Sequence, residues 1–126
     1  MSQPGFRLAA RARSFRYAAR GIVALVRSQH NAWIHAAASI AVIALGLAVG
    51  LSRVEWCFVA VAITGVWIAE ALNTAFEALC DVASPAAHPL VERAKDIAAG
   101  SVLIAAVGAV VIGLLVFGPH LLPHAG

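Results

Sequence analysis

Three long apolar stretches constrain the fold of this chain more than any other feature of its sequence. They cover residues 32–51, 54–80 and 97–117, and each reaches the roughly 20 residues with which an α-helix crosses the core of a bilayer. The composition agrees, because 62% of the residues are hydrophobic and 12% are charged, against about 45–50% and about 25% in a soluble domain. The sequence therefore predicts an all-α integral membrane protein, with one membrane domain over residues 1–126.

The segment ahead of the first span, residues 5–28, mixes six arginines with apolar and aromatic residues. This mixture predicts an amphipathic surface helix that lies against anionic lipid headgroups; the alternative is a solvated basic arm that only sets the topology. No acidic residue precedes Glu55, so the positive-inside rule places the segment in the cytoplasm. The loop over residues 82–95, which contains Arg93 and Lys95, is then cytoplasmic as well, and we expect the chemistry on that side.

Four polar residues lie in the second apolar stretch and at its end: Glu70, Asn73, Glu77 and Asp81. At about 100° per residue they fall within about 80° of one another on a helix, so they share one narrow face. At about 1.5 Å of rise per residue, Glu70 lies about 10 Å deeper than Glu77 and about 16 Å deeper than Asp81. The pattern predicts a polar row that runs from the cytoplasm into the membrane.

Ionisable groups at membrane depth are costly and face a bundle interior, a water-filled cleft or a bound ion. Hydrogen bonds that hold helices together are the alternative, above all for Asn73. Three carboxylates with few basic neighbours are better explained by a bound cation than by hydrogen bonds between helices. Magnesium prefers carboxylate oxygens and keeps waters and phosphate oxygens in its shell, so the row indicates Mg²⁺ and a nucleotide.

A second motif, "RAKD" over residues 93–96, contains the only lysine of the chain. Lys95 can neutralise a phosphate, and Asp96 can hold that lysine or a ribose hydroxyl. Taken alone, the motif is better explained by a topogenic lysine and an aspartate at a helix start. The sequence contains neither a P-loop nor the protein-kinase signatures.

Taken together, "EALNTAFEALCD" (residues 70–81) and the downstream "AKD" resemble the small prokaryotic lipid kinases of the diacylglycerol kinase and undecaprenol kinase family. Their mark is an E-x-x-N-[ST]-A-[IF]-E-x-x-x-D helix followed by A-K-D, and the resemblance covers residues 15–117. It implies a homotrimer in the bacterial inner membrane, with composite active sites between protomers. It also implies ATP- and magnesium-dependent transfer of the γ-phosphate to the primary hydroxyl of a lipid alcohol, diacylglycerol or undecaprenol. Membrane lipids are then partners, and nucleic acid is not.

Carried over position by position, the resemblance makes Glu70 the base that receives the proton of the lipid hydroxyl. It makes Glu77 a magnesium ligand, and Asn73 a residue that orients the phosphates or Glu70. The depth of Glu70 fits this role, because a lipid hydroxyl lies below the aqueous surface whereas ATP arrives from the cytoplasm.

The nucleotide end of the implied site contains residues from three parts of the chain. Asp81 supports the nucleotide, Lys95 holds the phosphates and Asp96 binds near the sugar. Tyr17 matches a family position beside the nucleotide, with an interfacial aromatic anchor as the alternative. His88 falls in the loop that lines the nucleotide, where we expect a backbone role.

One position departs from the family pattern. Gln29 stands where many relatives have a glutamate that serves as a second metal ligand, and a glutamine oxygen brings no charge to the ion. The neighbouring residues match an N-x-x-I-H pattern, residues 31–35, that is common in the undecaprenol kinase branch. For His35 itself we expect a hydrogen bond to a headgroup or a cap on a neighbouring helix, and no catalytic role.

Two other classes of function remain open at this point. A small transport or proton-relay subunit would also place carboxylates along one face inside the membrane, but it would need a polar path across the whole bilayer. The outer half of the second span offers only Glu55 at its edge and Thr64 within it. A catalytically inactive relative that binds lipid or nucleotide is the other alternative, made conceivable by Gln29.

Overall fold

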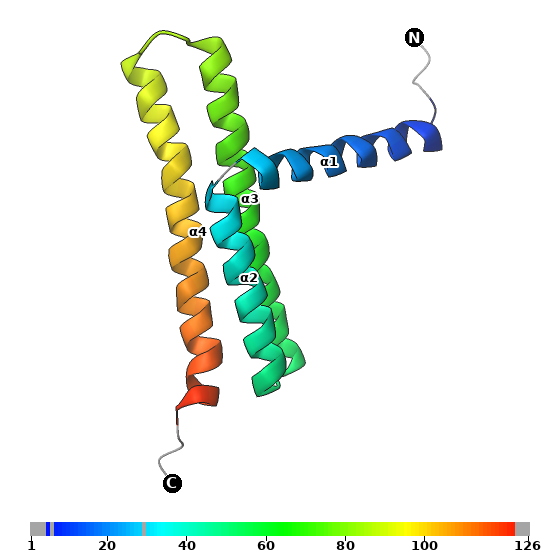
Figure 1. Cartoon of the computed structure of the whole chain (residues 1–126), viewed down its shortest axis with the longest axis vertical. Helices are drawn as coiled ribbons and strands as arrows, with labels where there is room; N and C mark the ends of the chain where they lie inside the picture. The colour runs from blue at the N-terminus through cyan, green and yellow to red at the C-terminus, as the bar shows by residue number, and fades with distance from the viewer. Residues whose placement is uncertain (1–4, 6, 29, 123–126) are drawn as a thin grey trace.

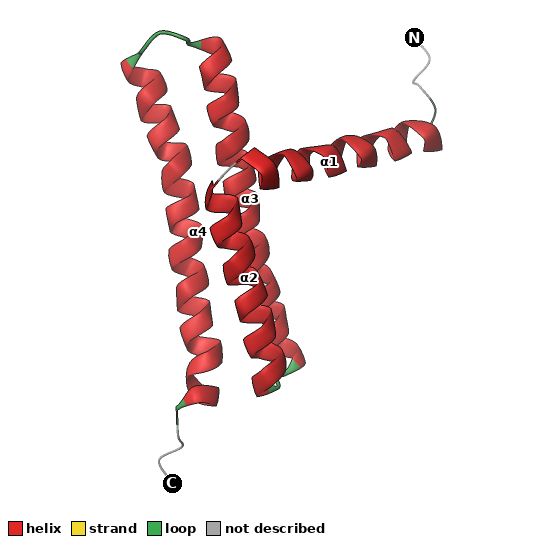
Figure 2. Cartoon of the chain, in the orientation of Figure 1, coloured by secondary structure: helices red, strands yellow, loops and turns green. Residues whose placement is uncertain are grey.

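The structure of the chain is a computed structural model, which describes residue 5, residues 7–28 and residues 30–122. Helices joined by short loops make up the described residues, which contain no strand (Figure 2). In chain order the helices are α1 (Leu8–Ser28), α2 (His30–Val49), α3 (Arg53–Ala83) and α4 (Pro89–Leu121). The all-α prediction is thereby confirmed.

The two longest helices, α3 and α4, form an antiparallel hairpin (Figure 1). The third apolar helix, α2, lies along one half of this hairpin and leaves the half next to the α3–α4 connection uncovered. The first helix, α1, projects sideways away from the bundle (Figure 1). The start of α2 therefore meets α3 near the middle of the latter.

Three helices are long and apolar enough to cross a membrane: α2 from Asn31, α3 and α4. At about 1.5 Å per residue, the 31 residues of α3 and the 33 of α4 extend about 46 Å and about 50 Å. Both lengths exceed the hydrocarbon core of about 30 Å. The chain is thus a multi-pass membrane protein whose hairpin is longer than the apolar layer it crosses.

The connection between α3 and α4 is shorter than the loop predicted over residues 82–95. It spans only residues 84–88, because His88 caps α4 and Pro89 occupies its first turn. Proline is favourable there, since its missing N–H has no partner in a first turn. The predicted span began at residue 97 because hydropathy detects only the part of a helix that lies in lipid. The first turns of α4 are polar, so hydropathy did not assign them to the helix. Lys95 and Asp96 consequently lie on a helix.

A small apolar core lies at the opposite end of the bundle, next to the turn between α2 and α3. It contains Leu51, Val59, Val116 and Phe117. Most other large apolar side chains of the helices point outward. Outward apolar side chains suit a helix surrounded by lipid or by other membrane helices.

Candidate active site

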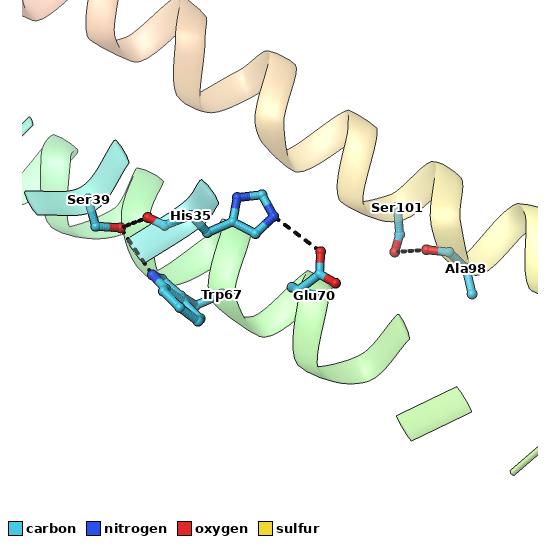
Figure 3. Close-up of polar contacts among 6 residues, drawn as sticks. All are labelled: His35, Ser39, Trp67, Glu70, Ala98 and Ser101. Carbon is cyan, nitrogen blue, oxygen red and sulfur yellow. Dashed lines mark hydrogen bonds and ion pairs between the residues drawn. The ribbon is translucent and has the colours of Figure 1, made fainter. Parts of the chain in front are cut away.

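Glu70 lies in the middle of α3 and is the most deeply buried charged side chain of the described residues, with 1% of its surface exposed. Its Oε2 atom lies 3.1 Å from Nε2 of His35 on α2, which is hydrogen-bonding distance. The contact joins the side chains of α2 and α3 directly (Figure 3). A buried carboxylate with a hydrogen-bonded partner is the arrangement that makes an ionisable group tolerable at membrane depth.

Two further side chains fix His35 against α3 (Figure 3). The indole Nε1 of Trp67 donates a hydrogen bond of 3.1 Å to Oγ of Ser39, and Ser39 Oγ donates one of 2.7 Å to the backbone oxygen of His35. The rings of His35 and Trp67 meet edge to face, with their centroids 6.2 Å apart. Two side-chain hydrogen bonds, one helical turn apart, thus join α2 to α3.

One turn from Glu70, toward the α3–α4 connection, two buried polar atoms have no hydrogen-bond partner among the described residues. They are Oδ1 of Asn73 and Oγ1 of Thr74. Asn73 is 8% exposed, and a buried carbonyl oxygen without a donor costs about 1–3 kcal/mol. These atoms are therefore available to a ligand or to a neighbouring chain. Asn73 makes no hydrogen bond that orients Glu70, which was one of its two predicted roles.

An ion pair lies at the end of the polar row that is next to the α3–α4 connection. Lys95 on α4 extends its Nζ to within 3.2 Å of Oδ1 of Asp81 on α3. Asp81 is exposed, whereas Glu77 is half-buried. The sequence predicted that Asp96 could hold the lysine, and this is wrong: Asp96 follows Lys95 on the same helix, and the partner comes from the facing helix.

Two other predicted residues, His88 and Tyr17, make their contacts away from Glu70. His88 accepts a 3.2 Å hydrogen bond from the backbone N–H of Leu90 through its Nδ1, so its imidazole caps α4 where a backbone role was expected. Tyr17 is exposed on α1, and the guanidinium of Arg20 lies 5.8 Å from its ring centroid. Gln29 lies outside the described residues, so its predicted metal contact stays a prediction.

An apolar groove of about 300 Å³ opens between α2, α3 and α4 on the side of Glu70 that faces away from the α3–α4 connection. His35 and Ser39 line it at the level of Glu70, and Phe117 lines it at the far end. Its other lining residues are Ala, Val, Ile and Gly. Within the described residues, the polar row therefore ends at Glu70 and continues as an apolar surface.

The described residues contain no group of three His, Cys, Asp or Glu side chains that could hold a metal ion by themselves. A metal at this site would need ligands from elsewhere, such as phosphate oxygens, waters or another chain.

These features define a multi-pass membrane protein with a buried carboxylate between two spans and an ion pair farther along the same hairpin, near the α3–α4 connection. A family model described as prokaryotic diacylglycerol kinase matches residues 16–117, and the chain belongs to this family of lipid kinases. It is 44% identical over 109 residues to a protein of Bacillus subtilis named undecaprenol kinase, a match covering 86% of this chain and 89% of the relative. It is 38% identical over 110 residues to a Synechocystis protein named diacylglycerol kinase, covering 86% of this chain and 63% of that relative.

Sequence reasoning missed the contact between His35 and Glu70. A signal for it existed, because His35 and Ser39 are the only hydrophilic residues between Ala32 and Leu51, and a carboxylate deep in the second span requires a donor. The sequence predicted a headgroup contact or a cap on a neighbouring helix for His35, whereas its hydrogen bond is to the side chain of Glu70 in the middle of α3.

Proposed function

We propose that this lipid kinase transfers the γ-phosphate of ATP to the primary hydroxyl of a membrane lipid alcohol, with Glu70 as the general base. The observation that carries the proposal is the burial of Glu70 at 1% exposure at the inner end of the polar row, where an apolar groove begins. A base so placed can receive a proton from a hydroxyl that lies below the headgroup surface. The family assignment supports phosphoryl transfer as the reaction.

The nucleotide belongs, in this proposal, at the protruding end of the hairpin. Lys95 holds the phosphates, Asp81 positions that lysine, and Asp96 binds near the ribose. Support comes from the 3.2 Å contact between Lys95 and Asp81, which fixes a cation about 16 Å along α3 from Glu70. The γ-phosphate of an ATP molecule bound there extends inward along the row. Tyr17 and His88 border the nucleotide in the same proposal.

A magnesium ion fits the oxygen atoms between these two ends. The Glu77 carboxylate and the unpartnered Oδ1 of Asn73 lie one turn apart on α3, and both are hard oxygen donors of the kind Mg²⁺ prefers. Magnesium usually keeps waters and phosphate oxygens as its remaining ligands, so a group of three carboxylates is not required. When bound, the ion supplies charge neutralisation for the phosphates. Gln29 would add a neutral oxygen.

The proposed assembly is a homotrimer in the bacterial inner membrane, with the N-terminus and the α3–α4 connection in the cytoplasm. Six arginines in and just before α1 support this orientation by the positive-inside rule, and α1 serves as the amphipathic surface helix. The family resemblance implies the trimer. Asn73 and Thr74, which have no partner among the described residues, are compatible with a site that a neighbouring protomer completes.

The lipid substrate in this proposal is undecaprenol or diacylglycerol, both primary alcohols at the membrane surface. The N-x-x-I-H pattern over residues 31–35 and the name of the Bacillus subtilis relative favour undecaprenol. The name of the Synechocystis relative favours diacylglycerol. The apolar groove suits either hydrocarbon chain, and it gives no support to the transport alternative, which needs a polar path.

The test is phosphate transfer from labelled ATP and magnesium to each lipid, presented separately to the purified protein in mixed micelles. Labelled lipid with either alcohol supports the proposal, and the ratio of the two initial rates identifies the substrate. A folded protein that binds ATP but labels neither lipid contradicts the proposal and favours the inactive-relative alternative.

A further inference from the structure

We propose that His35 is a positioning residue for Glu70, whose imidazole N–H holds one carboxylate oxygen so that the other faces the lipid hydroxyl. The inference rests on the proposed function of Glu70 as the base. Its basis is the 3.1 Å contact between Nε2 of His35 and Oε2 of a glutamate that is 1% exposed. A carboxylate that serves as a base only accepts hydrogen bonds, so the proposal requires the His35 tautomer that has its hydrogen on Nε2.

Orientation matters because the two oxygens of a carboxylate are equivalent until one of them is engaged. With Oε2 bonded to His35, Oε1 becomes the oxygen that receives the lipid proton. A general base acts only within hydrogen-bond reach of the proton it abstracts, and a displacement of about 1 Å can cost a factor of about 100 in rate. Fixing the carboxylate therefore contributes directly to the rate of transfer.

The imidazole can perform this task because its own position is fixed. The edge of one ring meets the face of the other in the His35–Trp67 pair, and Trp67 bonds Ser39, which in turn bonds the backbone of His35. These contacts hold α2 and α3 in one register at the height of Glu70. His35 also lines the apolar groove, so the pair lies where the apolar surface meets the polar row.

The test compares His35→Ala with His35→Gln. Glutamine keeps an N–H donor on a side chain of similar reach, whereas alanine removes the donor. We expect His35→Ala to lower kcat about 10- to 100-fold and to leave the KM for ATP unchanged, since the nucleotide end lies about 16 Å away along α3. We expect His35→Gln to recover most of the lost kcat.

The matched control is His120→Gln, which makes the same chemical change at the other end of the bundle, where His120 contacts Glu55. It should leave kcat unchanged. Full activity in His35→Ala, or equal losses in the Ala and Gln variants with normal folding, would overturn the positioning role.

Glu70→Gln is measured beside these variants to separate the two proposals. If Glu70→Gln retains turnover, Glu70 is not the general base and the proposed function is contradicted. If Glu70→Gln is inactive while His35→Ala is fully active, only the inference about His35 fails.

Discussion

Lys95 Nζ lies 3.2 Å from Asp81 Oδ1 and joins α4 to α3 near the connection between them. The two residues are 14 positions apart, so the pair exists only because the hairpin brings its two arms together. The side chain of Lys95 is 36% exposed and that of Asp81 is 71% exposed, so the pair itself adds little to stability. The effect of the pair is to hold in place the side chain of Lys95, the only lysine of the chain.

Replacing this lysine should weaken ATP binding. We expect Lys95→Met to raise the KM for ATP about tenfold or more, because it removes a charge-assisted hydrogen bond to phosphate. The measurement is the initial rate as a function of ATP concentration at saturating lipid. Arg93→Met removes an exposed positive charge from the same turn of α4 and serves as the control. Equal effects of the two changes would mean that Lys95 acts only through net charge.

The half-buried carboxylate of Glu77 is the charged ligand of the proposed magnesium site. Glu77→Gln should therefore raise the magnesium concentration needed for half-maximal activity by about tenfold, since a neutral oxygen binds a hard cation less tightly. The measurement is a magnesium titration at fixed ATP. Glu92→Gln, an exposed change at the start of α4, should leave the titration unaltered. An unchanged midpoint for Glu77→Gln would remove it from the metal site.

Close packing between α2 and α3 depends on Gly46. A Cβ atom at this position would lie 2.6 Å from the Trp56 ring and 2.9 Å from a methyl of Leu51, which is too close for carbon atoms. We expect Gly46→Ala to lower the free energy of unfolding by about 1–3 kcal/mol, the usual cost of overpacking. Gly108→Ala is the control, because a Cβ there meets nothing within 4 Å.

The comparison of these two glycines is made by unfolding each variant from mixed micelles with increasing amounts of sodium dodecyl sulfate. Gly108→Ala should be neutral or stabilising, since alanine is favoured over glycine in a helix interior. Indistinguishable midpoints for the two variants would contradict the packing argument.

Glu55 stabilises the end of the bundle opposite the active site through two interactions. Its backbone N–H and side chain complete a capping box with Ser52 at the start of α3, and its Oε2 lies 2.6 Å from Nε2 of His120 on α4. We expect Glu55→Ala to lower the midpoint of unfolding more than His120→Ala does, because the latter leaves the capping box intact. The detergent unfolding assay ranks the stability of the two variants. A larger loss of stability in His120→Ala than in Glu55→Ala would contradict the role of the capping box.

The helices of this protein could be predicted from its sequence, whereas the contacts between the helices could not. Three apolar stretches predict three spans because lipid requires every backbone group to be bonded within its own segment. The sequence placed the start of the last helix at residue 97, whereas α4 begins at Pro89. The first turns of α4, which include Lys95, are helical but polar, so the apolar pattern does not include them. Proline at a first helical position was the available signal.

The candidate site was predictable along one helix and unpredictable between helices. The spacing of Glu70, Asn73 and Glu77 follows from the helical period alone. The pairing of Glu70 with His35, 35 residues away, depends on the register between α2 and α3, which the Trp67 contacts help to fix. Helical periodicity carries no information about that register.

The measurement that tests the central claim most directly is single-turnover transfer of labelled γ-phosphate to lipid by the unaltered protein and by Glu70→Gln, with ATP binding measured on both. The account predicts that the variant binds ATP normally and transfers phosphate at least about 100-fold more slowly, the lower range for loss of a general base. Transfer by Glu70→Gln at a rate close to that of the unaltered protein would contradict the account.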